Sequence, residues 1–224
     1  MNALAMKRAA AVGVQRQTVT GGEPAILADI YRDDVNLCVW QRRPDAGLNN
    51  AVEQFIDANP RFQHAVSVSP GRAQDVLTPL LTSRVAATAL VEDIAELVDM
   101  YCCLFGQEKV GLRLSVLDRA MCPKFHVDLV LCRLVTTYLG AGTEWLAHEA
   151  VDRSKLGSGS GGKPDHESGL YRDSSDIQQL QGGDVALLKG EAWEGNENAG
   201  LVHRSPSLGV GERRLLLTLD MVAD

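Results

Sequence analysis

Apolar and polar positions alternate along residues 35–40, and this period of two predicts a strand. Apolar residues at 48–56 recur instead with helical spacing, and Pro60 is expected to end the helix that they form. A longer apolar stripe with the same spacing runs from 91 to 105, with acidic residues off the stripe. It predicts a second helix that stops at Gly106. The first half of the chain is therefore expected to be mixed and mainly helical.

From Gly111 onward the apolar segments become shorter and more strand-like. Alternation at 112–116 is followed by apolar runs at 129–139, 185–188 and 215–219, with Gly and Pro between them. Several short strands separated by turn residues are typical of a sandwich or barrel of the jelly-roll kind.

Together these patterns predict an α+β fold in which N-terminal helices pack on a jelly-roll (double-stranded β-helix) core. The core is expected at residues 111–224 and the mainly helical region at 21–110. Residues 152–176 are rich in Gly, Ser and charge, and they are expected to form a mobile surface loop within the core. Residues 1–20 are expected to form a flexible tail.

The composition narrows the range of functions. The chain has 224 residues, 45% of them hydrophobic, and carries 22 Lys and Arg against 29 Asp and Glu, a net charge of −7. This acidic balance argues against a nucleic-acid partner, because phosphate binding needs a basic surface. No apolar run approaches the roughly 20 residues of a membrane span, so no membrane association is expected. The five cysteines form no C-x-x-C pair, which favours a reducing compartment and predicts a cytoplasmic protein.

The segment CPKFHVDLV carries the candidate chemistry. It places His126 and Asp128 two residues apart beside a predicted strand, where residues i and i+2 point to the same face. His203, in GLVHRSP just before the last strand, is the third candidate ligand. Two histidines and one carboxylate on one face of a metal leave its opposite face open, which is the facial triad of non-haem Fe(II) sites. An anionic, bidentate co-substrate could occupy the open positions.

Such a co-substrate needs a cationic partner for its distal carboxylate. Arg213 and Arg214 lie ten and eleven positions after His203, and an arginine fork matches the geometry of a carboxylate. Only one of the two can face inward on a strand, and the spacing favours Arg213.

Arg133 and Tyr138 lie in the apolar run that follows Asp128, and each has two interpretations. Arg133 either lines the pocket and binds an acidic group or extends along apolar surface to solvent. Tyr138 either hydrogen-bonds the co-substrate or belongs to the core.

The order H-x-D, a long interval, His203 and an arginine about ten residues later resembles the 2-oxoglutarate- and Fe(II)-dependent oxygenases, whose double-stranded β-helix carries those groups in that order. RLVTTYLGAGTEWL is similar to the strand and turn after H-x-D in the prolyl-hydroxylase branch, and GGDVALLKG resembles the strand before the distal histidine. The resemblance implies Fe(II) held by His126, Asp128 and His203, with 2-oxoglutarate paired to Arg213. The reaction implied is hydroxylation of a small-molecule or protein substrate that the sequence does not identify.

A closer resemblance covers roughly residues 24–221. MCPKFHVDLVLCRLVTTYLGAGTEWL, GDVALLKGEAWEGN and HRSP followed by GERRLLLTLD resemble an uncharacterised bacterial family, a domain of unknown function (number 1826). Genes of that family are often found near zinc-homeostasis genes.

That neighbourhood leaves a second function open: a non-catalytic metal-binding protein or zinc-homeostasis accessory that uses the same site. Cys122, four residues before His126, would then join the other ligands in a closed four-ligand site, and a thiolate ligand favours zinc over iron. A third interpretation is a cupin-like metalloenzyme that does not use 2-oxoglutarate.

Overall fold

A computed structural model describes residues 15–82 and 85–222 of the chain. Its centre is a seven-stranded sheet in which all neighbours are antiparallel except the first pair. In spatial order the strands are β1 (Gln17–Gly21), β2 (Val35–Trp40), β8 (Val185–Lys189), β5 (Cys132–Leu139), β10 (Arg214–Met221), β4 (Val110–Leu117) and β3 (Gln63–Val68).

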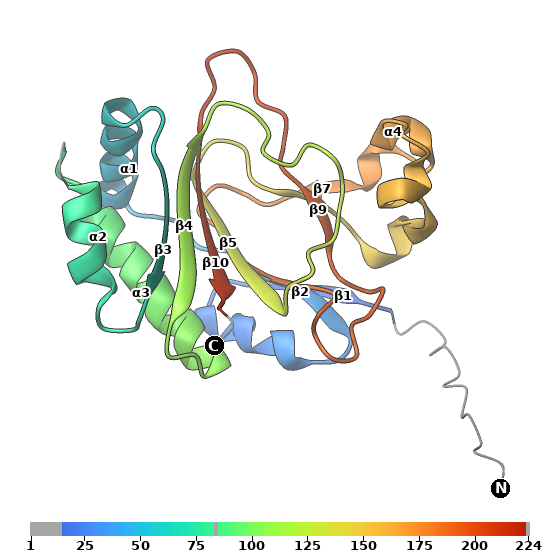
Figure 1. Ribbon diagram of the computed structural model, residues 1–224, viewed down its shortest axis with the longest axis horizontal. Coiled ribbons are helices and arrows are strands. Elements are labelled where there is room, and N and C mark those ends of the chain that lie inside the picture. The colour runs from blue at the N-terminus through green and yellow to red at the C-terminus, as the bar shows by residue number, and fades with distance from the viewer. Residues whose placement is uncertain (1–14, 83–84, 223–224) are drawn as a thin grey trace, which may run out of the picture.

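A second, three-stranded sheet lies on the other side from the helical layer (Figure 1). It has the order β7 (Ile177–Gln179), β6 (Glu144–Leu146) and β9 (Val202–Arg204), and the isolated bridge between His126 and His203 adds one more chain segment beside β9. The two sheets form a sandwich with an apolar interior.

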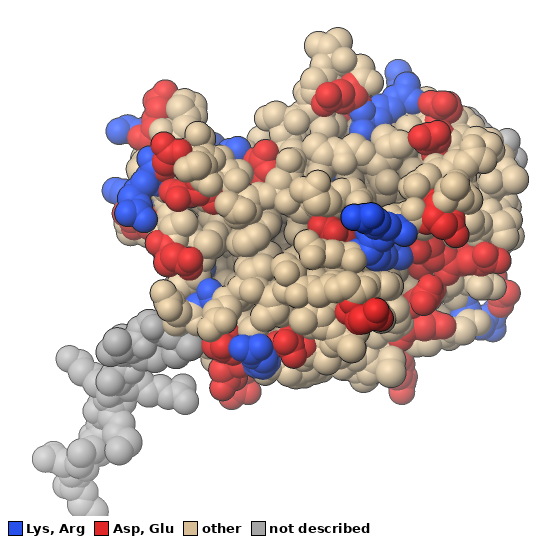
Figure 2. Space-filling view, turned by 180° about the vertical axis from the view of Figure 1, so that it is seen from behind, with Lys and Arg blue, Asp and Glu red and all other residues tan. Residues whose placement is uncertain are grey.

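The helices α1 (Ala46–Ala58), α2 (Ala73–Leu81) and α3 (Thr88–Phe105) cover the opposite face of the large sheet (Figure 1). The 3-10 helix η1 (Pro24–Tyr31) packs on β2 and β8. Acidic side chains gather toward this helical side of the molecule (Figure 2). Among the described residues, none of the helices combines the length and apolar character that a bilayer crossing requires.

The alternation within β10 shows how the sequence separates the two faces of the large sheet. Leu215, Leu217 and Leu219 are buried against the helices. The intervening Leu216 belongs to the apolar cluster between the two sheets. Because successive side chains of a strand point to opposite faces, one segment serves both layers.

The predicted helices at 48–56 and 91–105 are confirmed, and α3 ends at Gly106, whose left-handed conformation suits a residue without Cβ. The strands predicted at 35–40, 112–116, 185–188 and 215–219 are confirmed, and β5 occupies the run predicted at 129–139. Mixed α and β structure with a large sheet is thus established.

Other regions differ from expectation. Residues 1–14 of the predicted tail lie outside the described residues, but residues 17–20 form most of β1, which pairs with β2. The large sheet combines strands from both sides of residue 110: β1, β2 and β3 form its two ends, and four later strands lie between them. The region 152–176, expected to be a mobile loop, contains four short helical segments. They are η3 (Arg153–Lys155), η4 (Gly157–Ser160), α4 (Asp165–Ser168) and η5 (Ser174–Asp176), and η2 (His148–Ala150) precedes them.

One close backbone contact joins the large sheet to the segment that carries Asp128. Gly190 follows β8, its N–H donates to the carbonyl of Leu131, and the next N–H donates to the carbonyl of Asp128. A Cβ added at Gly190 would collide with the carbonyl oxygen of Val130 and lie 2.8 Å from that of Asp128. Only glycine fits here without moving the segment 128–131.

We predict that Gly190→Ala lowers the free energy of unfolding by about 1–3 kcal/mol, the usual cost of overpacking. Gly22→Ala is the control, because a Cβ at Gly22 meets no atom within 4 Å. Urea denaturation of both variants measures the effect, and equal midpoints would contradict the close contact.

Candidate metal centre

Two histidines that are far apart in the sequence face each other across a pair of backbone hydrogen bonds. The N–H of His126 donates to the carbonyl of His203, and the N–H of His203 donates to that of His126, both at 3.0 Å. A reciprocal pair of this kind places the two side chains on the same side of the ladder. The centroids of the two rings are 4.6 Å apart.

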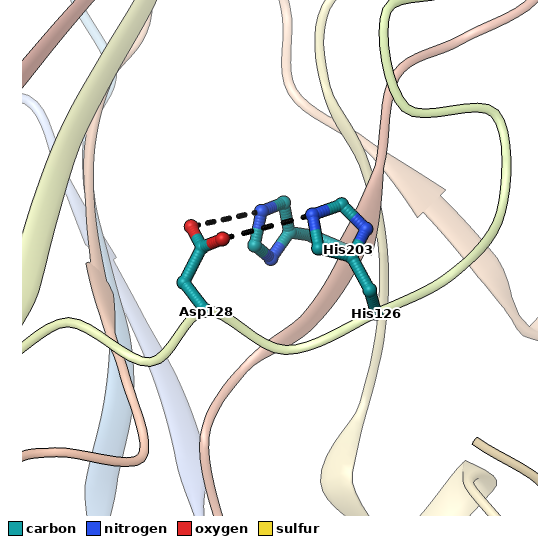
Figure 3. A group of neighbouring side chains, drawn as sticks. All are labelled: His126, Asp128 and His203. Atoms are coloured by element: carbon teal, nitrogen blue, oxygen red, sulfur yellow. Dashed lines mark ion pairs between the residues drawn. The ribbon is translucent and has the colours of Figure 1, made fainter. Parts of the chain in front are cut away.

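Each imidazole is oriented by its Nδ1 atom. Nδ1 of His126 lies 2.9 Å from the carbonyl oxygen of Lys124, and Nδ1 of His203 lies 3.1 Å from that of Leu201. A carbonyl only accepts hydrogen bonds, so each Nδ1 carries the proton and each Nε2 presents a lone pair. Both Nε2 atoms point toward Asp128 (Figure 3).

Asp128 closes the cluster of candidate ligands. Its Oδ1 lies 3.7 Å from Nε2 of His126, and its Oδ2 lies 3.4 Å from Nε2 of His203. All three ligand atoms lie within 4.8 Å of one another. Metal–ligand bonds of about 2.1 Å allow two ligands of one ion to be at most about 4.2 Å apart, so the two carboxylate–imidazole distances suit a shared ion.

The protonation states also suit a metal. Burial lowers the pKa of His126, and the neighbouring His203 lowers it further. Burial acts to raise the pKa of Asp128, but the neighbouring His203 and the positive charge of Arg133 outweigh it and bring the pKa to about 2. A neutral imidazole beside an ionised carboxylate is the state that binds a divalent cation.

Arg133 connects Asp128 to a second carboxylate. Its Nη1 donates to Oδ2 of Asp128 at 2.7 Å, while Nε and Nη2 donate to both oxygens of Asp220 at 2.7 and 3.0 Å. The bidentate pair with Asp220 determines the direction in which the remaining nitrogen points. Arg133 thereby binds Oδ2, the oxygen nearer to His203, and leaves Oδ1, which faces His126, without this contact.

Arg214 lies in the same cavity as His126 and His203 and is only 1% exposed. Its Nε and Nη2 donate to the hydroxyl of Thr137 at 3.2 and 2.9 Å, and Nη2 also donates to the hydroxyl of Thr143 at 2.7 Å. Among the described residues no carboxylate forms an ion pair with it. Burial alone lowers its pKa, to about 10. A buried cation without an anion is costly, so this part of the cavity is suited to an anionic ligand.

The strand register corrects the expectation that Arg213, and not Arg214, faces the cavity. Arg214 shares the inner face of β10 with Leu216, and Arg213 points away from the cavity. The guanidinium of Arg213 lies 3.5 Å from the carbonyl oxygen of Ile56 and 3.9 Å from the exposed Asp57.

Tyr138 is also outside the cavity, because it lies on the helical side of β5. Its hydroxyl donates to Asp93 of α3 at 2.6 Å, and Arg42 pairs with the same carboxylate. Its interpretation as a core residue therefore agrees with the structure, and a contact with a co-substrate does not. Arg133 does line the cavity, but its acidic partners belong to the protein.

Cys122 lines the cavity from an exposed position, yet it is not part of the cluster formed by the three candidate ligands. Its backbone carbonyl accepts from the N–H of Ser205. The structure therefore does not assemble the four-ligand set that includes a thiolate.

Three residues of the site were not found from the sequence: Thr137, Thr143 and Asp220. Thr137 lies on the same face of β5 as Arg133, and Asp220 lies on the same face of β10 as Arg214. Strand alternation could therefore have indicated both residues. Thr143 lies in a turn before β6, and no local pattern points to it.

The comparisons with known proteins concern the family and the fold of the chain. Residues 21–220 match a family described as "Protein of unknown function (DUF1826)". The chain belongs to this family. No curated protein matches the sequence.

Solved structures of oxygenases resemble the fold. A dioxygenase for auxin oxidation from Arabidopsis thaliana, in a complex with 2-oxoglutarate, is 9% identical and has a TM-score of 0.50, with 93% of each chain covered. A prolyl-4-hydroxylase from Pseudomonas putida is 11% identical, with a TM-score of 0.46 and coverage of 89% of this chain and 98% of its own. At such low identity the first likeness shows a shared fold and no more.

We predict that Asp220→Asn weakens binding of a divalent metal about tenfold, although Asp220 is not a candidate ligand. The change removes a nearby negative charge and frees Arg133 to compete with the metal for Asp128. Both effects weaken metal binding. Replacement of Arg133 itself would instead remove a positive charge and an orienting bond, which act in opposite directions.

Asp75→Asn is the charge-matched control, because its side chain is 68% exposed on the far side of the large sheet. Isothermal titration with Fe(II) under anaerobic conditions measures the effect. Identical affinities in the two variants would show that Asp220 does not support the site.

Proposed function

We propose that this member of the family is an Fe(II)- and 2-oxoglutarate-dependent oxygenase of the hydroxylase type, with its two sheets forming a double-stranded β-helix. The observation that carries the proposal is Arg214, a buried cation that no carboxylate of the described residues pairs with, in one cavity with two histidines beside a carboxylate. The likeness to the 2-oxoglutarate complex of the plant dioxygenase supports the fold on which this depends.

The candidate ligands fit Fe(II). His126, Asp128 and His203 supply two nitrogens and one oxygen, and such a set with open positions suits non-haem iron. Iron and 2-oxoglutarate bound there would supply the oxidising power, with O₂ and 2-oxoglutarate consumed and succinate, CO₂ and a hydroxylated substrate formed.

The protein's own groups would position the co-substrate. Nε and Nη2 of Arg214 donate to the hydroxyls of Thr137 and Thr143, so a distal carboxylate could accept from the remaining N–H groups of the guanidinium, on Nη1. Val135 and Leu216 line the same cavity, and their apolar side chains would favour a ligand over water there. Arg133 and Asp220 hold the carboxylate of Asp128 in place.

Arg214 also separates this proposal from the alternatives. A zinc-handling protein or a cupin-like metalloenzyme without 2-oxoglutarate has no need for a buried cation whose charge is unmatched. The zinc interpretation further needs Cys122 as a ligand, and that residue lies outside the cluster. The substrate and the cytoplasmic location remain predictions.

We predict that Arg214→Met raises the dissociation constant of 2-oxoglutarate at least about a hundredfold, since removing one member of a buried charge pair costs about 3–5 kcal/mol. Binding of Fe(II) should be nearly unchanged, which also verifies that the variant folds. The readout is the charge-transfer absorbance of the Fe(II)–2-oxoglutarate complex, titrated without oxygen.

Arg213→Met is the matched control, because the same change is made one residue away on the outer side of the sheet. It should leave the 2-oxoglutarate affinity within about twofold. No absorbance band in the wild type, or equal affinities in the two variants, would contradict the proposed function.

A further inference from the structure

A second, more open cavity adjoins the candidate metal centre. It has a volume of about 450 Å³, within the range that accommodates small organic ligands. Three residues line both cavities: Arg113, Ser115 and Met121. We call this second cavity the β3–β4 groove, because its floor is formed by those strands.

The position of the groove follows from the unequal size of the two sheets. Among the strands of the large sheet, β2 and β8 each contribute two residues to the apolar cluster between the sheets, whereas β5, β10 and β4 contribute one each, which is Leu117 for β4. Further along, β4 and β3 place Arg113 opposite Ala65, and Ser115 opposite Gln63, on the same face. Residues 118–121, which lead into the ligand segment, form the side of the groove. A polar inner face beside a reactive centre is a suitable surface for a substrate.

The first cavity holds both paired and unpaired arginines. Arg133 and Arg204 are paired with carboxylates there, whereas Arg214 forms no ion pair with any described residue. Arg113 and Arg119, which line the groove, form no ion pair with any described residue. Asp118 is the one acidic residue that lines it.

Two unpaired arginines are notable in a chain with a net charge of −7, because such a chain repels anions on average. A local excess of positive charge is then needed wherever an anion must bind. The groove provides that excess next to the candidate metal centre.

We propose that the β3–β4 groove binds a small-molecule substrate through an anionic group, a carboxylate or a phosphate monoester, which pairs with Arg113 and is assisted by Arg119. Since Arg113 lines both cavities, an anion on its guanidinium leaves the rest of the molecule next to His126 and His203. The term substrate rests on the proposed function, whereas the anion site rests on the groove alone.

The test uses three probes of similar shape: 4-fluorobenzoate, 4-fluorophenyl phosphate and the neutral 4-fluorobenzamide. Their binding to metal-free protein is followed by ¹⁹F NMR at low ionic strength, and it is repeated in Arg214→Met to identify any binding at Arg214. The wild type should bind at least one anionic probe about tenfold more tightly than the amide. The stronger of the two anionic probes identifies the preferred group.

Arg113→Gln should abolish this preference for charge, and Arg119→Gln should reduce it less. Arg43→Gln is the matched control, because Arg43 is exposed, lies outside both cavities and carries the same charge. It should bind all three probes as the wild type does. Absence of a charge preference in the wild type, or its persistence in Arg113→Gln, would overturn the inference.

The two proposals fail separately. Affinity of Arg113→Gln for Fe(II) and 2-oxoglutarate should equal that of the wild type, because Arg113 has no part in holding either. A preference for anions that depends on Arg113, in a protein that does not bind 2-oxoglutarate, would keep the anion site and reject the oxygenase. Binding of 2-oxoglutarate without that preference would keep the oxygenase and reject the site.

Discussion

The reciprocal hydrogen bonds between the backbones of His126 and His203 are the constraint on which the whole site depends. They join the segment before β5 to β9, although the two histidines are 77 positions apart in the sequence. The carbonyl two residues before each histidine then orients its ring, and both Nε2 atoms face Asp128.

The arginines around the site have two different roles, depending on whether a carboxylate of the protein pairs with them. Arg133 and Arg204 are held by carboxylates of the protein, so their charges are compensated and their role is to orient neighbouring groups. Among the described residues, Arg214 is bound by hydroxyls alone, so its charge stays uncompensated in the interior. A fold that retains such a residue carries a cost in stability, which an anionic ligand would offset on binding.

Local pattern was enough to predict much of this protein. The H-x-D spacing placed His126 and Asp128 on one face, and the position of His203 before the last strand made it the third candidate. The sequence alone does not determine whether Arg213 or Arg214 faces the cavity, because a shift of one residue in register moves every side chain of a strand to the opposite face. Here β5 has an irregular register against β10 between Leu215 and Leu216, and this is a property of the pairing that neither strand shows alone.

The central claim is that a metal at the three ligands and an anion at Arg214 belong to one co-substrate site. A crystal structure of the protein grown without oxygen, with Fe(II) and 2-oxoglutarate, tests it most directly. The account predicts one iron bound by His126, Asp128 and His203, and 2-oxoglutarate bound to that iron with its distal carboxylate on Arg214. Iron bound through Cys122, or 2-oxoglutarate located away from Arg214, would contradict it.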